Sequence, residues 1–156
     1  MATYKKIKEL ATARENVKWG VDSDKYENHI WYSADGVTIW RTSDPEILSM
    51  CRLYAKPQIN VPMIRDIIRM NPEMRLNTPE LKDKKRGSIY ELDHDPRHYI
   101  AFPAKAIGDI LAMKKACIFE AHLIVDKPVL VVFEIYKDLF MMDMKPIAII
   151  MGLRRC

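Results

Sequence analysis

Glycine and cysteine are scarce in this chain of 156 residues, and their scarcity excludes several kinds of site. With only five glycines, the sequence has no phosphate-cradling loop of the G-x-G-x-x-G or G-K-[ST] kind. The three cysteines, Cys51, Cys117 and Cys156, form no C-x-x-C motif, so neither a disulfide framework nor a zinc ribbon is indicated. A G-x-S-x-G motif is also missing. We therefore expect no enzyme and no cofactor, and we expect Cys51 and Cys117 in the core.

Long hydrophobic runs are missing as well. The most apolar stretches, 128–133 and 146–153, are far shorter than the roughly 20 residues that span a bilayer. The start, MATYKKIKEL, has no apolar run behind its basic residues and does not read as a signal peptide. With 49% hydrophobic and 29% charged residues, the composition is that of a globular protein. We expect a cytoplasmic protein that does not associate with membranes.

Hydrophobic periodicity predicts a mixture of helices and strands. Apolar residues recur at helical spacing over 3–17, 62–70 and 104–115, and a proline opens each of the last two segments. Ala34-Asp35-Gly36 separates two strand-like runs, 29–33 and 37–42, which predicts a hairpin. The segment 46–55 fits either a strand or a short helix. Further strands are expected at 57–61, 88–92, 99–102, 116–125, 129–136 and 139–144, with a last apolar segment at 146–153.

One heptapeptide pattern occurs three times. Ile64–Met70 recurs as Ile107–Met113, and Ile7–Ala13 is a weaker copy. Either any amphipathic helix with an early acidic residue looks like this, or the chain repeats a unit of helix and antiparallel strands. We expect an α+β fold with amphipathic helices on an antiparallel sheet. It would form a single domain over 1–156, divisible into two helix-strand repeats (about 1–72 and 99–153) joined by a polar segment, 73–98.

The best candidate for chemistry is the segment 91–98, which is rich in acidic residues and histidine. It supplies the carboxylates and imidazoles that a divalent metal prefers, namely Glu91, Asp93, His94, Asp95 and His98. Pro96, however, breaks any helix that would place both histidines on one face. A solvated turn between strands explains the segment better. A metal-dependent hydrolase remains an alternative.

Basic residues occupy the polar faces of all three predicted helices. The chain carries a formal net charge of +4, and cations gathered on one surface bind nucleic acid by neutralising phosphates. A solvated helix face explains any single helix equally well, whereas three helices facing one way would form an interface. The candidate nucleic-acid-binding residues are Lys5, Lys8, Arg65, Arg69, Lys105, Lys114 and Lys115.

The pattern resembles that of the sliding clamps, the ring-shaped processivity factors of DNA polymerases. The likeness begins with the helix over 4–15 and the hairpin at Asp35-Gly36. It continues through two strand-proline-helix segments, 59–69 and 99–111, and a closing strand pair, 127–133 and 139–144. It covers most of the chain as a pattern and rests on no diagnostic motif. Clamp subunits carry two or three domains, for which this chain is too short.

The resemblance implies a replication accessory protein that tethers a partner to duplex DNA without catalysis. The helices would hold the phosphates without reading sequence, and edge strands would join copies of the chain into a homo-oligomer. An apolar groove near the C-terminal strands would receive a DNA polymerase or another replication protein through Met141, Met142, Pro146 and Ile147, unless these residues fill core gaps. The alternative is a small protein-protein interaction module with no nucleic-acid role.

Overall fold

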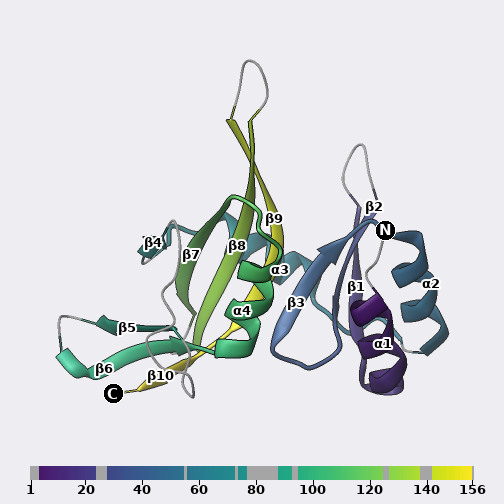
Figure 1. Cartoon of the computed structure of the whole chain (residues 1–156), viewed down its shortest axis with the longest axis horizontal. Coiled ribbons are helices and arrows are strands. Elements are labelled where there is room, and N and C mark those ends of the chain that lie inside the picture. Colours follow the sequence, from purple (N-terminus) through teal and green to yellow (C-terminus); the bar gives the residue numbers. More distant parts are fainter. Residues whose placement is uncertain are drawn as a thin grey trace. The chain divides into compact units, whose positions relative to one another are not determined.

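The computed structural model describes residues 4–23, 28–54, 56–72, 74–76, 88–92, 95–124, 127–137 and 142–155 (Figure 1). The chain divides into two compact units, Met1–Arg69 and Met70–Cys156. Each unit combines helices with antiparallel strands, so the predicted α+β class is confirmed.

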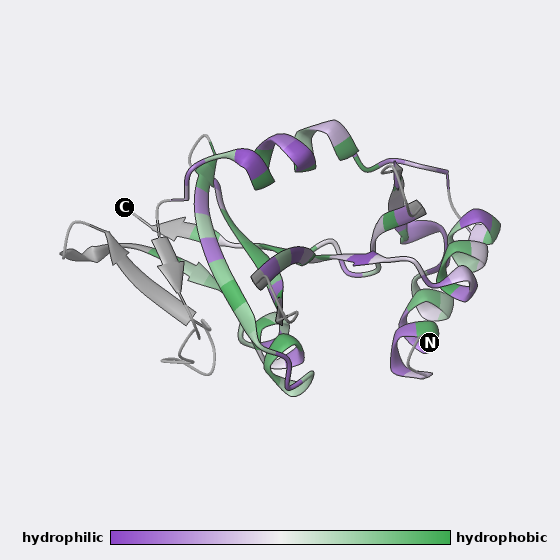
Figure 2. Ribbon diagram, turned by 90° about the horizontal axis from the view of Figure 1, so that it is seen from above, coloured by the Kyte–Doolittle hydropathy of each residue, from purple (hydrophilic) through white to green (hydrophobic). Residues whose placement is uncertain are grey.

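Unit 1 consists of a helix, a three-stranded meander and two further helices. Helix α1 (Tyr4–Ala13) runs into a short 3-10 turn, η1 (Arg14–Asn16). Strands β1 (Lys18–Ser23), β2 (Asn28–Ser33) and β3 (Thr38–Thr42) then pair antiparallel in chain order. Helices α2 (Pro45–Tyr54) and α3 (Val61–Arg69) follow. In Figure 2 the helix next to the N-terminus alternates between hydrophilic and hydrophobic bands, as an amphipathic helix should.

The predicted Asp-Gly hairpin joins β2 to β3. Gly36 has a φ of 75°, which a residue without a Cβ adopts at little cost. The Asp35 carboxylate accepts hydrogen bonds from the backbone N–H groups of Val37, at 2.8 Å, and Thr38, at 3.0 Å. These bonds hold the turn in place and set the register of the two strands.

Side-chain caps determine where the two later helices of unit 1 begin. At α2, Asp44 accepts a hydrogen bond from the Glu46 N–H at 2.9 Å, so the segment whose period was ambiguous is a helix. At α3, Asn60 accepts one from the Met63 N–H at 3.2 Å. The strand expected at 57–61 is wrong, because these residues lead into that cap and Val61 already belongs to α3.

The sheet of unit 1 lies between two helical layers. Successive strand residues point to opposite faces. Helices α1 and α2 cover the face that carries Trp19, Ile30 and Tyr32, and they bury Leu10, Ile47 and Cys51 against it. Helix α3 covers the other face. There Gly20 lies so close to the chain leading into α3 that a Cβ would meet the Ile59 oxygen at 2.8 Å.

The described part of unit 2 contains one helix and two antiparallel sheets. One sheet has the order β9-β8-β7-β4, and the other the order β10-β6-β5. The elements are β4 (Met74–Leu76), β5 (Ser88–Leu92), β6 (Asp95–Phe102), α4 (Ala104–Ala112), β7 (Cys117–Ile124), β8 (Lys127–Lys137), β9 (Met142–Met151) and β10 (Leu153–Arg155). Two expected segments, 139–144 and 146–153, thus contribute to one strand. Pro146 fits inside β9 because it lies at a register shift opposite Phe133.

The same arrangement of a helix followed by three antiparallel strands occurs in both units. In unit 1 it is α1-β1-β2-β3, and in unit 2 it is α4-β7-β8-β9. Buried residues match in pairs: Leu10 with Ile110, Trp19 with Phe119 and Tyr32 with Val132. The weaker sequence copy, Ile7–Ala13, is therefore the structural counterpart of Ile107–Met113. Ile64–Met70 is not, because α3 covers the other face of its sheet and precedes no such meander.

Candidate functional site

The basic residues predicted in unit 1 lie on two opposite sides of its sheet. Lys5 and Lys8 are exposed on α1, on the side away from the buried Leu10. Arg69 is exposed on α3, which packs against the other face of the sheet. The condition for one shared interface, that all three basic helices face one way, is therefore not met within unit 1, because the sheet separates α1 from α3.

Arg65, the fourth predicted cation of unit 1, is bound to a carboxylate. Its Nε donates a hydrogen bond to Asp22 Oδ1 at 2.9 Å, and its terminal nitrogen contacts the same oxygen. The Trp31 indole N–H donates to the other oxygen, Oδ2, at 3.0 Å. Arg41 Nε lies 3.9 Å from Oδ2. Arg65 thus links α3 to the sheet and does not present an unneutralised charge.

The Asp22 carboxylate is stabilised in its charged form. The residue is 8% exposed, and burial by itself raises its pKa. The hydrogen bonds from Arg65 and Trp31, together with the positive charges of Arg65 and Arg41, outweigh burial, so the pKa lies below its ordinary value. A carboxylate that accepts charged and neutral donors on both oxygens ties elements together and has no proton to offer at neutral pH.

The basic residues predicted in unit 2 lie at both ends of α4. Lys105 is exposed in the first turn of α4, and Lys114, with a φ of 53°, is exposed just after the helix. Lys115 is half exposed and forms an ion pair with Glu134, Nζ to Oε2 3.5 Å. The Tyr136 hydroxyl donates to the same Glu134 oxygen at 2.8 Å.

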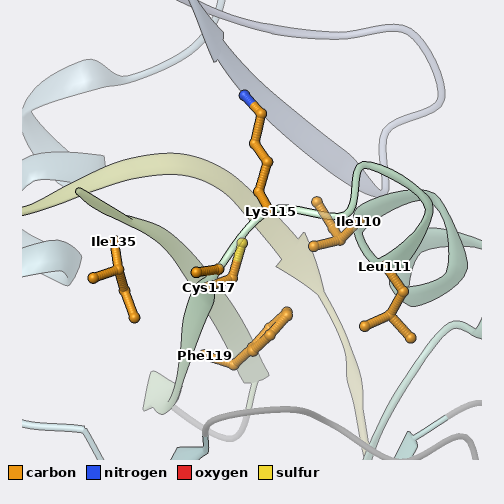
Figure 3. A pocket seen from close by; sticks show the side chains of 7 residues that line it. Ile110, Leu111, Lys115, Cys117, Phe119 and Ile135 are labelled. Carbon is orange, nitrogen blue, oxygen red and sulfur yellow. The ribbon is translucent and has the colours of Figure 1, made fainter. Parts of the chain in front are cut away.

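An apolar pocket of about 280 Å³ opens beside Lys115. Side chains from α4, β7 and β8 surround it, while the Lys115 Nζ points away from them (Figure 3). The lining residues are Ile110, Leu111, Lys115, Ala116, Cys117, Phe119 and Ile135. Sequence reasoning missed this pocket, because Ile110 and Ile135 are far apart in the chain and each fits an ordinary core pattern.

Of the two cysteines expected in the core, one is there and one lines the pocket. Cys51 is fully buried, and burial raises the pKa of its thiol to about 11. Cys117 is only half-buried. Burial also raises the pKa of Cys117, the Glu134 charge raises it further, and the Lys115 charge opposes this. Neither thiol is activated as a nucleophile by these surroundings.

The partner groove predicted at the C-terminal strands falls largely where the structure gives no side-chain description. Met141 lies outside the described residues, and only the backbone of Met142 is described. Pro146 and Ile147 are half-buried within β9. The role of these four residues in binding a partner therefore stays a prediction.

The segment 91–98 cannot be assembled into a site from the described side chains. Asp93 and His94 lie outside the described residues, and Glu91, Asp95 and His98 are described only by their backbone. Elsewhere in the described part of the chain, no group of three metal-ligating residues comes together. On β7, His122 Nε2 and Glu120 Oε1 form a buried pair 3.9 Å apart.

Comparison with protein-family models, with curated proteins and with solved structures gave no match for this chain. Within its described residues, no helix is both long and apolar enough to cross a membrane.

Proposed function

We propose that this chain is a clamp-like, DNA-binding replication accessory protein that tethers a partner to duplex DNA without catalysis. One observation carries the proposal: both units contain a helix followed by a three-stranded antiparallel meander, the arrangement that the resemblance to sliding clamps implies. The first helix of each repeat also carries exposed lysine, which supports a role for α1 and α4 in holding phosphates.

The DNA-contacting residues that we propose are fewer than the sequence indicated. Lys5 and Lys8 lie three residues apart on α1 and so share one stripe of its surface, and Lys105 and Lys114 serve unit 2. Arg65 is excluded because Asp22 neutralises it, and Arg69 because it lies on α3. Lys115 is excluded because it pairs with Glu134. Each lysine-phosphate contact releases counterions and reads no bases, so the protein would bind any duplex and slide along it.

The proposal is tested with two double variants, Lys5→Glu with Lys8→Glu and Lys105→Glu with Lys114→Glu. Each should weaken binding to a labelled 20-base-pair duplex by about tenfold or more, because repulsion replaces attraction at the phosphates. Fluorescence anisotropy between 50 and 200 mM NaCl measures this. The slope of log K against log salt should become shallower by about 0.9 for each phosphate that the variant no longer neutralises.

The matched control is Lys56→Glu with Arg69→Glu, which makes the same charge change at exposed positions outside α1 and α4. It should retain most of the wild-type affinity. Equal losses of affinity in all three double variants would mean that net charge alone matters, and a wild-type chain that does not bind at 50 mM NaCl would exclude the DNA role.

The proposal includes a homo-oligomer that acts in the cytoplasm together with a DNA polymerase or another replication protein. One short chain is too small to surround a duplex, so encirclement requires several copies. Native mass measurement with and without duplex DNA tests this directly. A chain that stays monomeric in both conditions would exclude the ring, while leaving phosphate binding to be judged by the anisotropy experiment.

A further inference from the structure

We propose that the pocket at the end of α4 is a docking site for a short segment of a protein partner, in which an apolar side chain is flanked by acidic residues. The site shares Lys114 with the proposed DNA interface, but its apolar pocket has no part in DNA binding. It lies entirely within unit 2, and of its lining residues only Lys115 is charged.

The floor and walls of the pocket accept an apolar group. Phe119, 1% exposed, and Ile110, 2% exposed, are buried beneath it, whereas Leu111 on α4 is 38% exposed. Exposure of the apolar Leu111 side chain to water is unfavourable in free energy. An apolar partner that covers this side chain would remove that unfavourable contribution. At about 280 Å³ the pocket is just below the range of ligand and cofactor sites, and its size suits one or two side chains.

The rim of the pocket selects the charge of the partner. Glu134 already accepts Lys115 at 3.5 Å and the Tyr136 hydroxyl at 2.8 Å. Lys145 lies over the Tyr136 ring, 5.0 Å from its centroid. Lys114 is exposed next to Lys115. Counted with Asp143, which lies opposite Tyr136 in the register of β8 and β9, the rim holds three lysines and two carboxylates. The small positive excess is complementary to acidic residues.

A peptide segment fits this surface better than a small molecule. Small-ligand sites enclose most of their ligand, but Leu111 at 38% and Tyr136 at 42% exposure lie at the surface beside the hollow. A bound small molecule would therefore stay partly in water. An extended segment can place one side chain in the pocket and its neighbours along the rim, so that both surfaces are used.

The experiment titrates the full-length protein with four acetylated, amidated hexapeptides, GDDLFG, GDDIFG, GDDMFG and GDDFFG. Binding is followed by NMR of the pocket methyl groups and backbone amides. We expect saturable shifts at Leu111, Cys117 and Ile135. The controls GKKLFG and GDDAAG should bind about tenfold more weakly, because one lacks the acidic flank and the other lacks the anchor.

Two variants identify the surface. Leu111→Asp should abolish the shifts, whereas Leu53→Asp, the same change at a leucine 75% exposed on α2, should leave them intact. Lys115→Glu combined with Lys145→Glu should reverse the charge preference, because Lys114 is then outnumbered by carboxylates, so that GKKLFG binds about tenfold more tightly than GDDLFG. Because the reversal creates binding, loss of the fold cannot imitate it.

Several results would overturn the proposal. One is that none of the four acidic peptides shifts the pocket resonances. Another is that octanoate binds as tightly as the best peptide, which would identify a site for small amphipathic carboxylates. A third is that the same resonances shift on raising the concentration of the protein alone, which would assign the pocket to contacts between copies. DNA binding is not read in this experiment, so its outcome leaves the DNA proposal unaffected.

Discussion

Residues from three elements hold the carboxylate of Asp22 inside unit 1. Trp31 on β2 and Arg65 on α3 donate hydrogen bonds to it, and Arg41 on β3 lies 3.9 Å away as an ion-pair partner. Because its pKa is lowered on folding, Asp22 contributes stability above the ordinary aspartate pKa of about 3.9. That contribution is lost as the pH falls through the lowered value. Asp22 therefore makes unit 1 sensitive to acid.

Replacing Asp22 with Asn should destabilise the protein by about 1.5–3 kcal/mol at pH 7, because charge-assisted hydrogen bonds are removed while Arg65 and Trp31 keep their donors. Urea unfolding at pH 7 and at about pH 2.5 measures the difference from wild type. The difference should shrink at the lower pH, because the stability that comes from a lowered pKa is progressively lost as the pH falls from the ordinary aspartate value towards the lowered one.

Asp66→Asn is the matched control, since Asp66 is exposed on the same helix as Arg65. It should change the free energy of unfolding by about 0.5 kcal/mol or less. An Asp22→Asn deficit of the same size at both pH values would contradict the electrostatic role and would leave only a packing role.

The sequence predicts that α3 carries basic residues, but it does not predict that Arg65 pairs with a carboxylate on another element. Helical spacing correctly places Arg65 on the polar face. Its partner Asp22 lies 43 residues away on β1, a strand whose six residues, KWGVDS, carry too few apolar side chains to be recognised. Periodicity describes a residue relative to its own element, and pairs between elements arise only from tertiary packing. The pocket was missed for the same reason.

At the scale of elements, the approach of α3 to the sheet depends on a residue without a side chain. A Cβ on Gly20 would lie 2.8 Å from the Ile59 oxygen and 2.8 Å from Val61 Cγ2. Real Cβ atoms do not approach backbone so closely, so a side chain at this position would displace the start of α3. The distance between α3 and β1 is thus limited by Gly20.

We predict opposite effects for two glycine substitutions. Gly20→Ala should destabilise the protein by about 1–3 kcal/mol, because the added methyl overpacks the interface with α3. Gly108→Ala should stabilise it by about 0.5–1 kcal/mol, since Gly108 lies inside α4 and its Cβ would meet nothing within 4 Å. Chemical denaturation of both variants checks this. If both substitutions change the free energy of unfolding equally, the flexibility of the glycine backbone determines the effect, and steric contact of the added methyl group does not.

The sequence predicts a helix, strand or turn correctly where a single short motif, such as a turn dipeptide or an apolar run, favours one structure. The Asp-Gly turn and the apolar runs of β7 and β8 were found within a few residues. The segment 46–55 was ambiguous because Ile47, Met50 and Leu53 fit two periods, and the Asp44 cap, a hydrogen bond with a specific geometry, determines the helix. The strand expected at 57–61 failed because its apolar residues, Ile59 and Val61, contact Gly20 as part of the approach to α3.

At the scale of the whole molecule, the three tryptophans are distributed unevenly. Trp19, Trp31 and Trp40 all belong to unit 1, so tryptophan fluorescence reports on unit 1 alone. Far-ultraviolet circular dichroism reports on both units. The two signals together can show whether the units unfold separately.

We predict that Leu10→Ala lowers the midpoint measured by tryptophan fluorescence, because deleting a fully buried leucine costs about 2–5 kcal/mol. Ile110→Ala, at the equivalent position of unit 2, should lower the circular dichroism midpoint and leave the fluorescence midpoint close to wild type. If both variants instead shift both signals together, the whole chain is one cooperative domain, as the sequence-based domain boundaries imply.

The order of elements in unit 1 affects how the protein is made. Its core joins α1, the β1-β2-β3 meander and α2, which follow one another directly along the chain, and α3 completes the unit at Arg69. Contacts between such near neighbours form quickly. We therefore expect the contacts within unit 1 to form while the ribosome is still synthesising unit 2, which would leave less apolar surface exposed to aggregation during translation.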